Sequence, residues 1–183
     1  MAFKVLESQI LYKGRVFELR KEQVRLPDGT LSSLDIIMHP GAIGVLPVDS
    51  SGQIWFVRQY RHATKETIWE LPAGTLEVGE TPADCAQREL REEIGMGAHK
   101  LDEIGDFYLA PGYSSERIHV FLGVDLFPDS LTGDVDEQID VDHMPVSAVY
   151  ALVEQGQIRD AKSLAILFLA RPYLQKMGWV VEI

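Results

Sequence analysis

The pattern of hydrophobic and polar positions predicts a chain that opens with β-strands and mixes strands with helices further on. Runs of alternating or continuous apolar residues, separated by turn signals such as Pro27-Asp28-Gly29, are typical of strands. The expected strands cover residues 5–10, 16–26, 34–38, 43–48, 53–60, 68–71, 101–108, 117–124 and 139–144. A long loop rich in Asp, Gly and Pro is expected at residues 127–137.

The clearest helix begins after Thr81, which is a good N-cap and is followed by Pro82 at the first helical position. Gly95 is expected to end it in a left-handed conformation. Its apolar stripe at helical spacing comprises Ala83, Ala86, Leu90 and Ile94. Two more helices are expected at residues 149–154 and 162–176, which makes the fold class α+β, with a mixed sheet between helices.

Composition limits the class of protein. The chain has 183 residues, 46% of them hydrophobic and 25% charged, which is typical of one globular domain, with or without an appended hairpin. Cys85 is the single cysteine, so neither an intrachain disulfide nor a cysteine-built zinc site is possible. No apolar run is long enough for a signal peptide or a membrane span, and we expect a cytoplasmic protein without a membrane partner.

The charge balance is acidic, with 28 Asp and Glu against 17 Lys and Arg and a formal net charge of -11. Proteins that bind nucleic acid through phosphate contacts are usually basic, so no nucleic-acid partner is expected. A small anionic ligand remains compatible with this charge, because a bound divalent cation can reverse the local sign.

Three acidic residues lie within one turn of each other on the helix that follows Thr81, at Glu89, Glu92 and Glu93. One interpretation is a solvated acidic face. Against it, Glu89 and Glu93 flank the apolar stripe instead of lying opposite it. Free backbone carbonyls are also expected near Ala73, where the preceding strand ends. Mg²⁺ prefers such hard oxygen ligands.

The same region resembles the Nudix box, G-x5-E-x7-R-E-U-x-E-E-x-G-U, in which U is an apolar residue. The matching positions are Gly74, Glu80, Arg88, Glu89, Leu90, Glu92, Glu93, Gly95 and Met96. So many fixed positions make a chance match improbable. Residues 59–61, 70–74 and 110–116, including Pro111, are similar to the branch that acts on ADP-ribose and other nucleoside diphosphate sugars.

The resemblance implies a Nudix α/β/α sandwich and a metal site. In that site Glu89 and Glu93 are the principal ligands, Glu92 assists, and the Ala73 carbonyl contributes. The ion would be Mg²⁺, with Mn²⁺ as a possible substitute. The implied catalytic residues are Glu92, Arg88 and Glu137, where Arg88 also pairs with Glu80 to brace the loop and helix.

Glu137 is the expected general base. In the ADP-ribose branch the base comes from a mobile loop before a late strand, and Glu137 stands two residues before Ile139. A carboxylate within hydrogen-bond reach of water can deprotonate it. Asp136 and Glu116 are the rival residues, and an acidic surface loop is the other interpretation.

The expected substrate-binding residues are Arg61, Arg58, Glu116, Asp35 and Tyr113. Arg61 corresponds to an arginine that contacts phosphates or the terminal ribose in this family. Strand alternation is expected to place Arg58 and Arg61 together on one face, opposite residues 59–60. The alternatives are a solvated strand edge for the arginines, an exposed loop acid for Glu116 and a core aromatic for Tyr113. Asp35 supplies an acid in the N-terminal strands, but no arginine lies beside it.

The function that the resemblance implies is Mg²⁺-dependent hydrolysis of the pyrophosphate bond of a nucleoside diphosphate sugar. ADP-ribose is the leading substrate. The alternatives are another sugar nucleotide such as GDP-mannose, or a nucleotide sensor without catalysis. Residues 1–40 are expected to form an N-terminal extension that pairs two subunits, next to a Nudix domain at residues 41–183. The candidate contacts of this homodimer are Val16, Phe17, Ile36 and Ile37.

Overall fold

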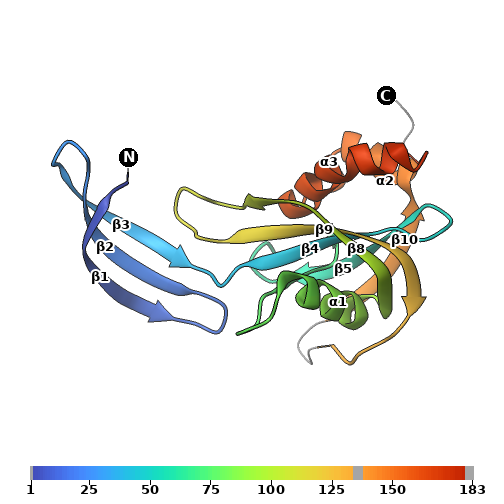
Figure 1. Cartoon of the computed structure of the whole chain (residues 1–183), viewed down its shortest axis with the longest axis horizontal. Coiled ribbons are helices and arrows are strands. Elements are labelled where there is room, and N and C mark those ends of the chain that lie inside the picture. Colours follow the sequence, from blue (N-terminus) through green and yellow to red (C-terminus); the bar gives the residue numbers. More distant parts are fainter. Residues whose placement is uncertain (1, 134–137, 180–183) are drawn as a thin grey trace.

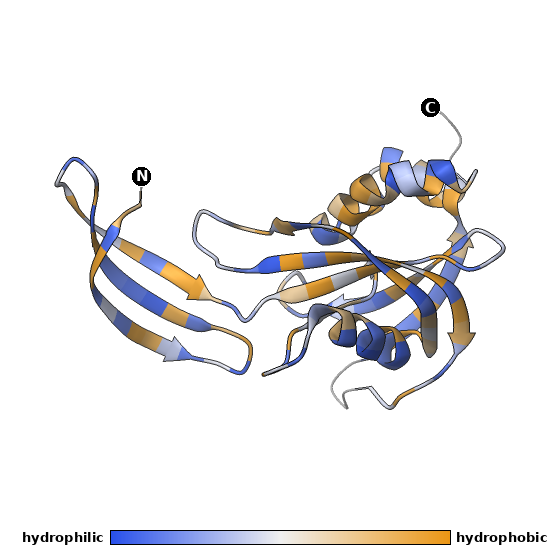
Figure 2. Ribbon diagram, viewed as in Figure 1, coloured by the Kyte–Doolittle hydropathy of each residue, from blue (hydrophilic) through white to orange (hydrophobic). Residues whose placement is uncertain are grey.

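A computed structural model describes residues 2–133 and 138–179, and it places the first strands outside the main body of the molecule. These strands form an antiparallel sheet in the order β1-β2-β3, with β1 (Lys4–Lys13), β2 (Glu18–Arg25) and β3 (Leu31–Met38). Figure 1 shows this N-terminal sheet projecting sideways from the rest of the chain. Hydrophobic and hydrophilic positions alternate along its strands (Figure 2).

The main body contains two further sheets. One is mixed, in the order β7-β4-β9-β8, because β4 and β9 run parallel, and the other is antiparallel, in the order β10-β5-β6. Their strands are β4 (Ala42–Pro47), β5 (Gln53–Arg61), β6 (Glu66–Glu70), β7 (Ala73–Thr75), β8 (Met96–Tyr108), β9 (Arg117–Pro128) and β10 (Ile139–Pro145). The predicted mixed sheet is therefore confirmed.

Helices cover both faces of these sheets. α1 (Pro82–Glu93) lies on one face, and α2 (Val146–Glu154) and α3 (Ala161–Lys176) lie on the other (Figure 1). Side chains of a strand alternate between faces. Accordingly Ile43 and Val45 pack in the apolar cluster of α1, whereas Leu46 packs in the cluster of α2 and α3. The predicted α/β/α sandwich is confirmed, and no helix within the described residues is long and apolar enough to cross a membrane.

Several element boundaries differ from the sequence prediction, and pairing explains them. Gly95 has a φ of +69°, so the chain turns out of α1 and enters β8 at once. Met96 pairs with Pro128 across β8 and β9, and both strands are therefore longer than predicted. The expected loop begins after Pro128 instead of at Phe127. Residues 73–75, expected at the end of a strand, form β7 by pairing with β4.

Candidate active site

α1 carries the acidic residues that the sequence singles out. Thr81 caps the helix, since its Oγ1 accepts a hydrogen bond from the Asp84 N–H at 3.2 Å. Of the predicted stripe, Ala86, Leu90 and Ile94 are buried against the sheet together with Cys85, whereas Ala83 is exposed. Glu89 and Glu93 are also buried, with only 8% and 7% of their surfaces exposed. Glu92 is half-buried. Two of the three carboxylates are thus buried, which contradicts a merely solvated acidic face for Glu89 and Glu93.

β7 lies directly against these buried carboxylates. The Ala73 N–H donates a hydrogen bond to Glu93 Oε2 at 3.0 Å. A Cβ added at Gly74 would lie 1.7 Å from Glu89 Oε1, so the missing side chain at Gly74 is what lets Glu89 approach the backbone. The pairing of Gly74 with Ile43 of β4 fixes this short strand in place. The β7 backbone and the carboxylates of Glu89 and Glu93 therefore lie together between β7 and α1.

Arg88 is the cation of this cluster. Its Nε and Nη2 donate to the two carboxylate oxygens of Glu80 at 2.9 and 3.1 Å, as the predicted pairing requires. Its Nη1 donates to Glu89 Oε1 at 2.7 Å and to Glu92 Oε2 at 2.9 Å. The hydrogen bonds that Arg88 donates lower the pKa of Glu80, and the same hydrogen bonds to Glu80 raise the pKa of Arg88. Arg88 is therefore a permanent positive charge among three carboxylates.

The donor set suits a hard divalent cation, because it combines carboxylates at Glu89, Glu92 and Glu93 with backbone oxygen at β7. The steric room at Gly74 brings one of these carboxylates against the backbone beside Ala73. In the described ranges, however, no three acidic, histidine or cysteine side chains surround a single point. Arg88 Nη1 lies between Glu89 and Glu92 instead. The chemistry of these residues fits a metal ion. For Glu89 and Glu92 to ligate it fully, Arg88 Nη1 would have to move away from their carboxylate oxygens.

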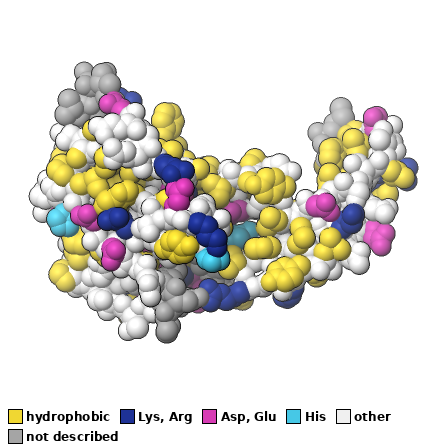
Figure 3. All heavy atoms as spheres, turned by 180° about the vertical axis from the view of Figure 1, so that it is seen from behind, with side chains coloured by type: hydrophobic (Ala, Val, Ile, Leu, Met, Phe, Trp, Pro, Cys, Tyr) yellow, Lys and Arg dark blue, Asp and Glu magenta, His cyan; other side chains and the backbone are white. Residues whose placement is uncertain are grey.

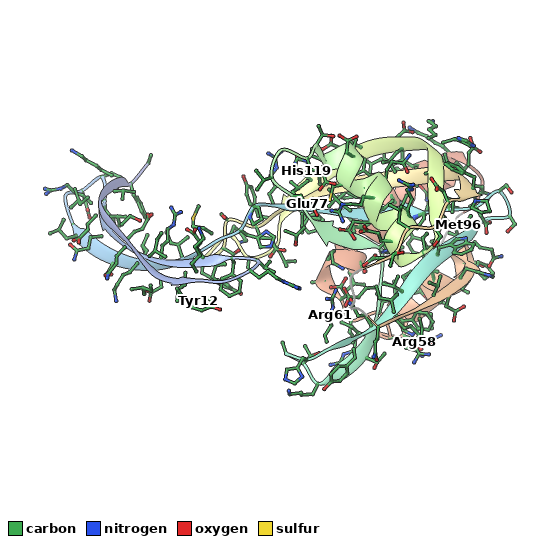
Figure 4. The ribbon with its side chains drawn as sticks, turned by 90° about the horizontal axis from the view of Figure 1, so that it is seen from below. Tyr12, Arg58, Arg61, Glu77, Met96 and His119 are labelled. Atoms are coloured by element: carbon green, nitrogen blue, oxygen red, sulfur yellow. The ribbon has the colours of Figure 1, made fainter. Side chains whose placement is uncertain are left out.

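The prediction that Arg58 and Arg61 share one face of β5 is wrong. Residues three apart in a strand point to opposite faces, because side chains alternate with a period of two. Arg58 pairs in register with Trp69 and lies over its ring, 5.0 Å from the ring centre. Arg61 instead donates from Nε and Nη2 to Glu70 at 2.5 and 2.8 Å. Figure 4 shows the two arginines at separate places along this strand.

Glu70 and Lys162 were missed by the sequence analysis. Lys162, in the first turn of α3, donates from Nζ to Glu70 Oε2 at 3.0 Å and to Asp160 Oδ2 at 2.8 Å. Glu70 is almost completely buried, with 3% of its surface exposed. The sequence signal that could have identified Glu70 is its position between the apolar Trp69 and Leu71. An acid in such a buried segment needs a partner of opposite charge or a hydrogen-bond donor.

The remaining predicted residues are spread over other parts of the chain. Tyr113 is exposed and Glu116 half-buried in the connection between β8 and β9. That connection contacts the N-terminal sheet, since Ile37 N–H donates to the Tyr113 carbonyl at 2.8 Å. Asp35 is exposed on β3, with Lys21 Nζ at 4.0 Å. The structure does not bring Asp35 to the acidic residues of α1 (Glu89, Glu92 and Glu93, the α1 cluster), because the N-terminal sheet projects away from them (Figure 1).

Glu137, the predicted base, and its rival Asp136 lie outside the described residues. Their proposed roles therefore stay predictions.

Comparisons with known proteins agree with this arrangement. Residues 38–166 match the NUDIX domain model, and residues 3–33 match the model of the nucleoside diphosphate sugar hydrolase N-terminal domain. An ADP-ribose pyrophosphatase of Bacillus subtilis is 40% identical over 87% of this chain and 88% of its own length. A GDP-mannose pyrophosphatase of Yersinia enterocolitica is 28% identical over 91% of this chain and 93% of its own length.

A solved structure supports the fold. The crystal structure of an ADP compounds hydrolase superposes with a TM-score of 0.86 and covers 98% of both chains at 24% sequence identity. The superposition includes almost the whole chain, so its fold is that of the solved protein.

Proposed function

This chain belongs to the NUDIX family, and from that premise we propose that it hydrolyses the pyrophosphate bond of a nucleoside diphosphate sugar. The products are a nucleoside monophosphate and a sugar phosphate, and ADP-ribose is the leading substrate. The observation that carries the proposal is the packing of Glu89 and Glu93 of α1 against β7, with the complete set of box acids around them. The relative named ADP-ribose pyrophosphatase supports the choice of substrate.

Nudix hydrolases need a divalent metal, and we propose Mg²⁺ here, with Mn²⁺ as a possible substitute. Glu89, Glu93 and the Ala73 carbonyl would hold it, assisted by Glu92. When bound, the ion offsets the negative charge that develops on the phosphoryl oxygens. Such an offset is needed because both the protein, with a net charge of -11, and a diphosphate are negative.

The side chains around this cluster have separable roles in the proposed reaction. Arg88 holds Glu80 in place and balances part of the charge of Glu89 and Glu92. Arg61, whose side chain is 41% exposed, offers its remaining N–H groups to a substrate phosphate. Glu137 takes the proton from the attacking water. We propose Tyr113, Glu116 and Arg58 as contacts of the base and sugar.

GDP-mannose is the second candidate substrate. The motivating observation is that β3 provides an acid, Asp35, but no arginine beside it. Recognition of the base therefore differs from the arrangement expected for ADP-ribose, in which both an acid and an arginine come from the N-terminal strands. The Yersinia relative named GDP-mannose pyrophosphatase supports this alternative. A sensor without catalysis is the third candidate, and the intact box acids argue against it.

A panel assay tests the proposal. The purified protein is incubated with Mg²⁺ and ADP-ribose, GDP-mannose or other sugar nucleotides, and release of phosphomonoester is measured. Glu93→Gln should lower kcat by at least about 10²-fold, as for other lost electrostatic stabilisers. Glu154→Gln, at the exposed end of α2, is the matched control. Absence of turnover on every substrate would favour the sensor.

We further propose that residues 1–40 pair two subunits and that residues 41–183 form the catalytic domain. Three strands that expose both faces gain little stability alone. Large apolar side chains are exposed on the N-terminal sheet and its turns, among them Val5, Ile10, Tyr12 and Phe17. Figure 3 shows hydrophobic side chains gathered on the surface of this sheet. Such a patch is typical of a protein interface.

A further inference from the structure

Four charged side chains alternate in sign between the end of β5 and the first turn of α3. Arg61 contacts Glu70, Glu70 contacts Lys162, and Lys162 contacts Asp160, through N–O distances of 2.5, 3.0 and 2.8 Å. We call these residues the charge chain. Lys162 and Glu70 are 92 positions apart in the sequence, so only the fold brings them together.

Burial along the charge chain is greatest at Glu70, the direct partner of the more exposed Arg61. The Arg61 side chain is 41% exposed, whereas the Lys162 and Glu70 side chains are 13% and 4% exposed. Burial alone would raise the pKa of Glu70, but hydrogen bonds from Arg61 and the charge of Lys162 outweigh it and lower that pKa. Glu70 is thus a buried, ionised carboxylate, and such a group needs compensating charge from its partners.

The charge chain is continuous with the segment that enters the active site. Ser163 Oγ accepts a hydrogen bond from the Leu71 N–H at 2.8 Å and donates to Asp160 Oδ2 at 2.6 Å. Leu71 lies two residues before Ala73, whose N–H contacts Glu93. The negative charge of Glu93 also acts on the Arg61 guanidinium. Arg61 therefore lies within electrostatic reach of the α1 cluster.

We propose that Lys162 is a positioning residue that acts through Glu70 to keep Arg61 available to a substrate phosphate. Glu70 Oε2 is shared by Arg61 Nη2 and Lys162 Nζ. Without Lys162, the buried charge of Glu70 would be balanced at this carboxylate by Arg61 alone, and Arg61 would be held more tightly and further inward. The inference rests on the proposed function, because it assigns Arg61 a diphosphate ligand.

Kinetics provide the first test. Lys162→Met removes the charge and keeps an unbranched side chain that is one atom shorter. With ADP-ribose and saturating Mg²⁺, we expect KM to rise by about tenfold, the effect of weakening one charge-assisted hydrogen bond. We expect kcat to stay within about twofold, because the chemical step is not touched. Lys162→Arg should restore KM. Lys176→Met, the same change at the far end of α3, is the matched control.

A double variant separates positioning from a general structural role. When Glu70→Gln has already removed the buried charge, Lys162→Met should leave KM unchanged. Two independent structural effects would instead multiply. The double variant also contains no unpaired Glu70 charge, so it remains testable if Lys162→Met alone fails to fold. An unchanged KM in Lys162→Met, or multiplied effects in the double variant, overturns the inference.

A measurement without substrate keeps this inference separate from the proposed function. The Arg61 Nε–H signal in NMR spectra, assigned through its loss in Arg61→Lys, should shift in Lys162→Met and stay in place in Lys176→Met. If the signal does not move, the inference is wrong whatever the enzyme hydrolyses. If it moves while wild type hydrolyses no sugar nucleotide, the proposed function fails and the positioning of Arg61 stands.

Discussion

Arg88 donates two hydrogen bonds to Glu80, from Nε to Oε1 at 2.9 Å and from Nη2 to Oε2 at 3.1 Å. Glu80 belongs to the loop before α1, and Arg88 lies in the middle of that helix. Glu80 Oε2 also accepts the Glu77 N–H at 3.1 Å. The pair therefore ties the loop to the helix at a point where both side chains are mostly buried.

Glu80→Ala should destabilise the fold because it leaves donors of Arg88 without their acceptor. We expect the free energy of unfolding to fall by about 1–3 kcal/mol. Urea denaturation measures this change, and Glu154→Ala at the surface should stay within about 0.5 kcal/mol of wild type. Unfolding of Glu80→Ala at the wild-type urea concentration would show that the pair does not brace the loop.

Stability should fall in acid because several carboxyl groups have lowered pKa values in the folded protein. Burial opposes the ionisation of both Glu70 and Asp160. At Glu70, Arg61 and Lys162 outweigh this effect and lower the pKa. At Asp160, Lys162 outweighs it and lowers the pKa. The unfolded state then binds more protons than the folded state as pH falls. The loss should begin near the ordinary values of 4.5 for Glu and 3.8 for Asp and continue below them.

Urea unfolding measured from pH 7 to pH 3 checks this expectation. Glu70→Gln should show a shallower decline than wild type, because its amide does not titrate. Glu154→Gln should follow the wild-type curve. Equal slopes for Glu70→Gln and wild type would contradict the assigned role of Glu70.

Local sequence signals explain why α1 and its acids could be predicted. Thr81, Pro82 and Gly95 act on their immediate neighbours, and the apolar stripe of α1 needs only a sheet to pack on. The lengths of β8 and β9 could not be read in this way. Their ends depend on the pairing of Met96 with Pro128, which is a contact between distant segments.

The same contrast holds in the candidate active site. Glu89 and Glu93 could be found because four residues make one helical turn. The contact of Lys162 with Glu70 joins α3 to β6. The residues near each of them in the sequence do not indicate which distant residue will be its partner. The error at Arg58 and Arg61 was of another kind, because strand alternation, applied correctly, places them on opposite faces.

Gly74→Ala should impair catalysis while leaving the fold intact. The new Cβ would lie 1.7 Å from Glu89 Oε1, so the Glu89 carboxylate must move. A displacement of about 1 Å at a catalytic group can cost about 10²-fold in rate, and we expect a loss of kcat of that order. Steady-state kinetics measure it, with circular dichroism to confirm folding. Wild-type turnover in folded Gly74→Ala would contradict the placement of Glu89 in the active site.

The N-terminal sheet should make the protein a homodimer in solution. Light scattering at micromolar concentration should give about twice the chain mass of 20.5 kDa. Phe17→Asp places a charge at an exposed apolar position in the turn between β1 and β2 and should shift the mass toward the monomer. Phe168→Asp, at an exposed apolar position of α3, should not. A monomeric mass for wild type would rule out the proposed pairing.

Glu137→Gln should lower kcat strongly and leave substrate affinity nearly intact, because a general base acts mainly in the transition state. The carboxylates of Glu89, Glu92 and Glu93 are poor alternatives, since the proposed metal ligation would occupy their oxygens and Arg88 already contacts Glu89 and Glu92. Asp136→Asn and Glu116→Gln are the comparison variants. Glu116 is half-buried in the connection between β8 and β9, beside the N-terminal sheet. Normal turnover in Glu137→Gln, together with inactive Asp136→Asn or Glu116→Gln, would move the base to the residue whose variant is inactive.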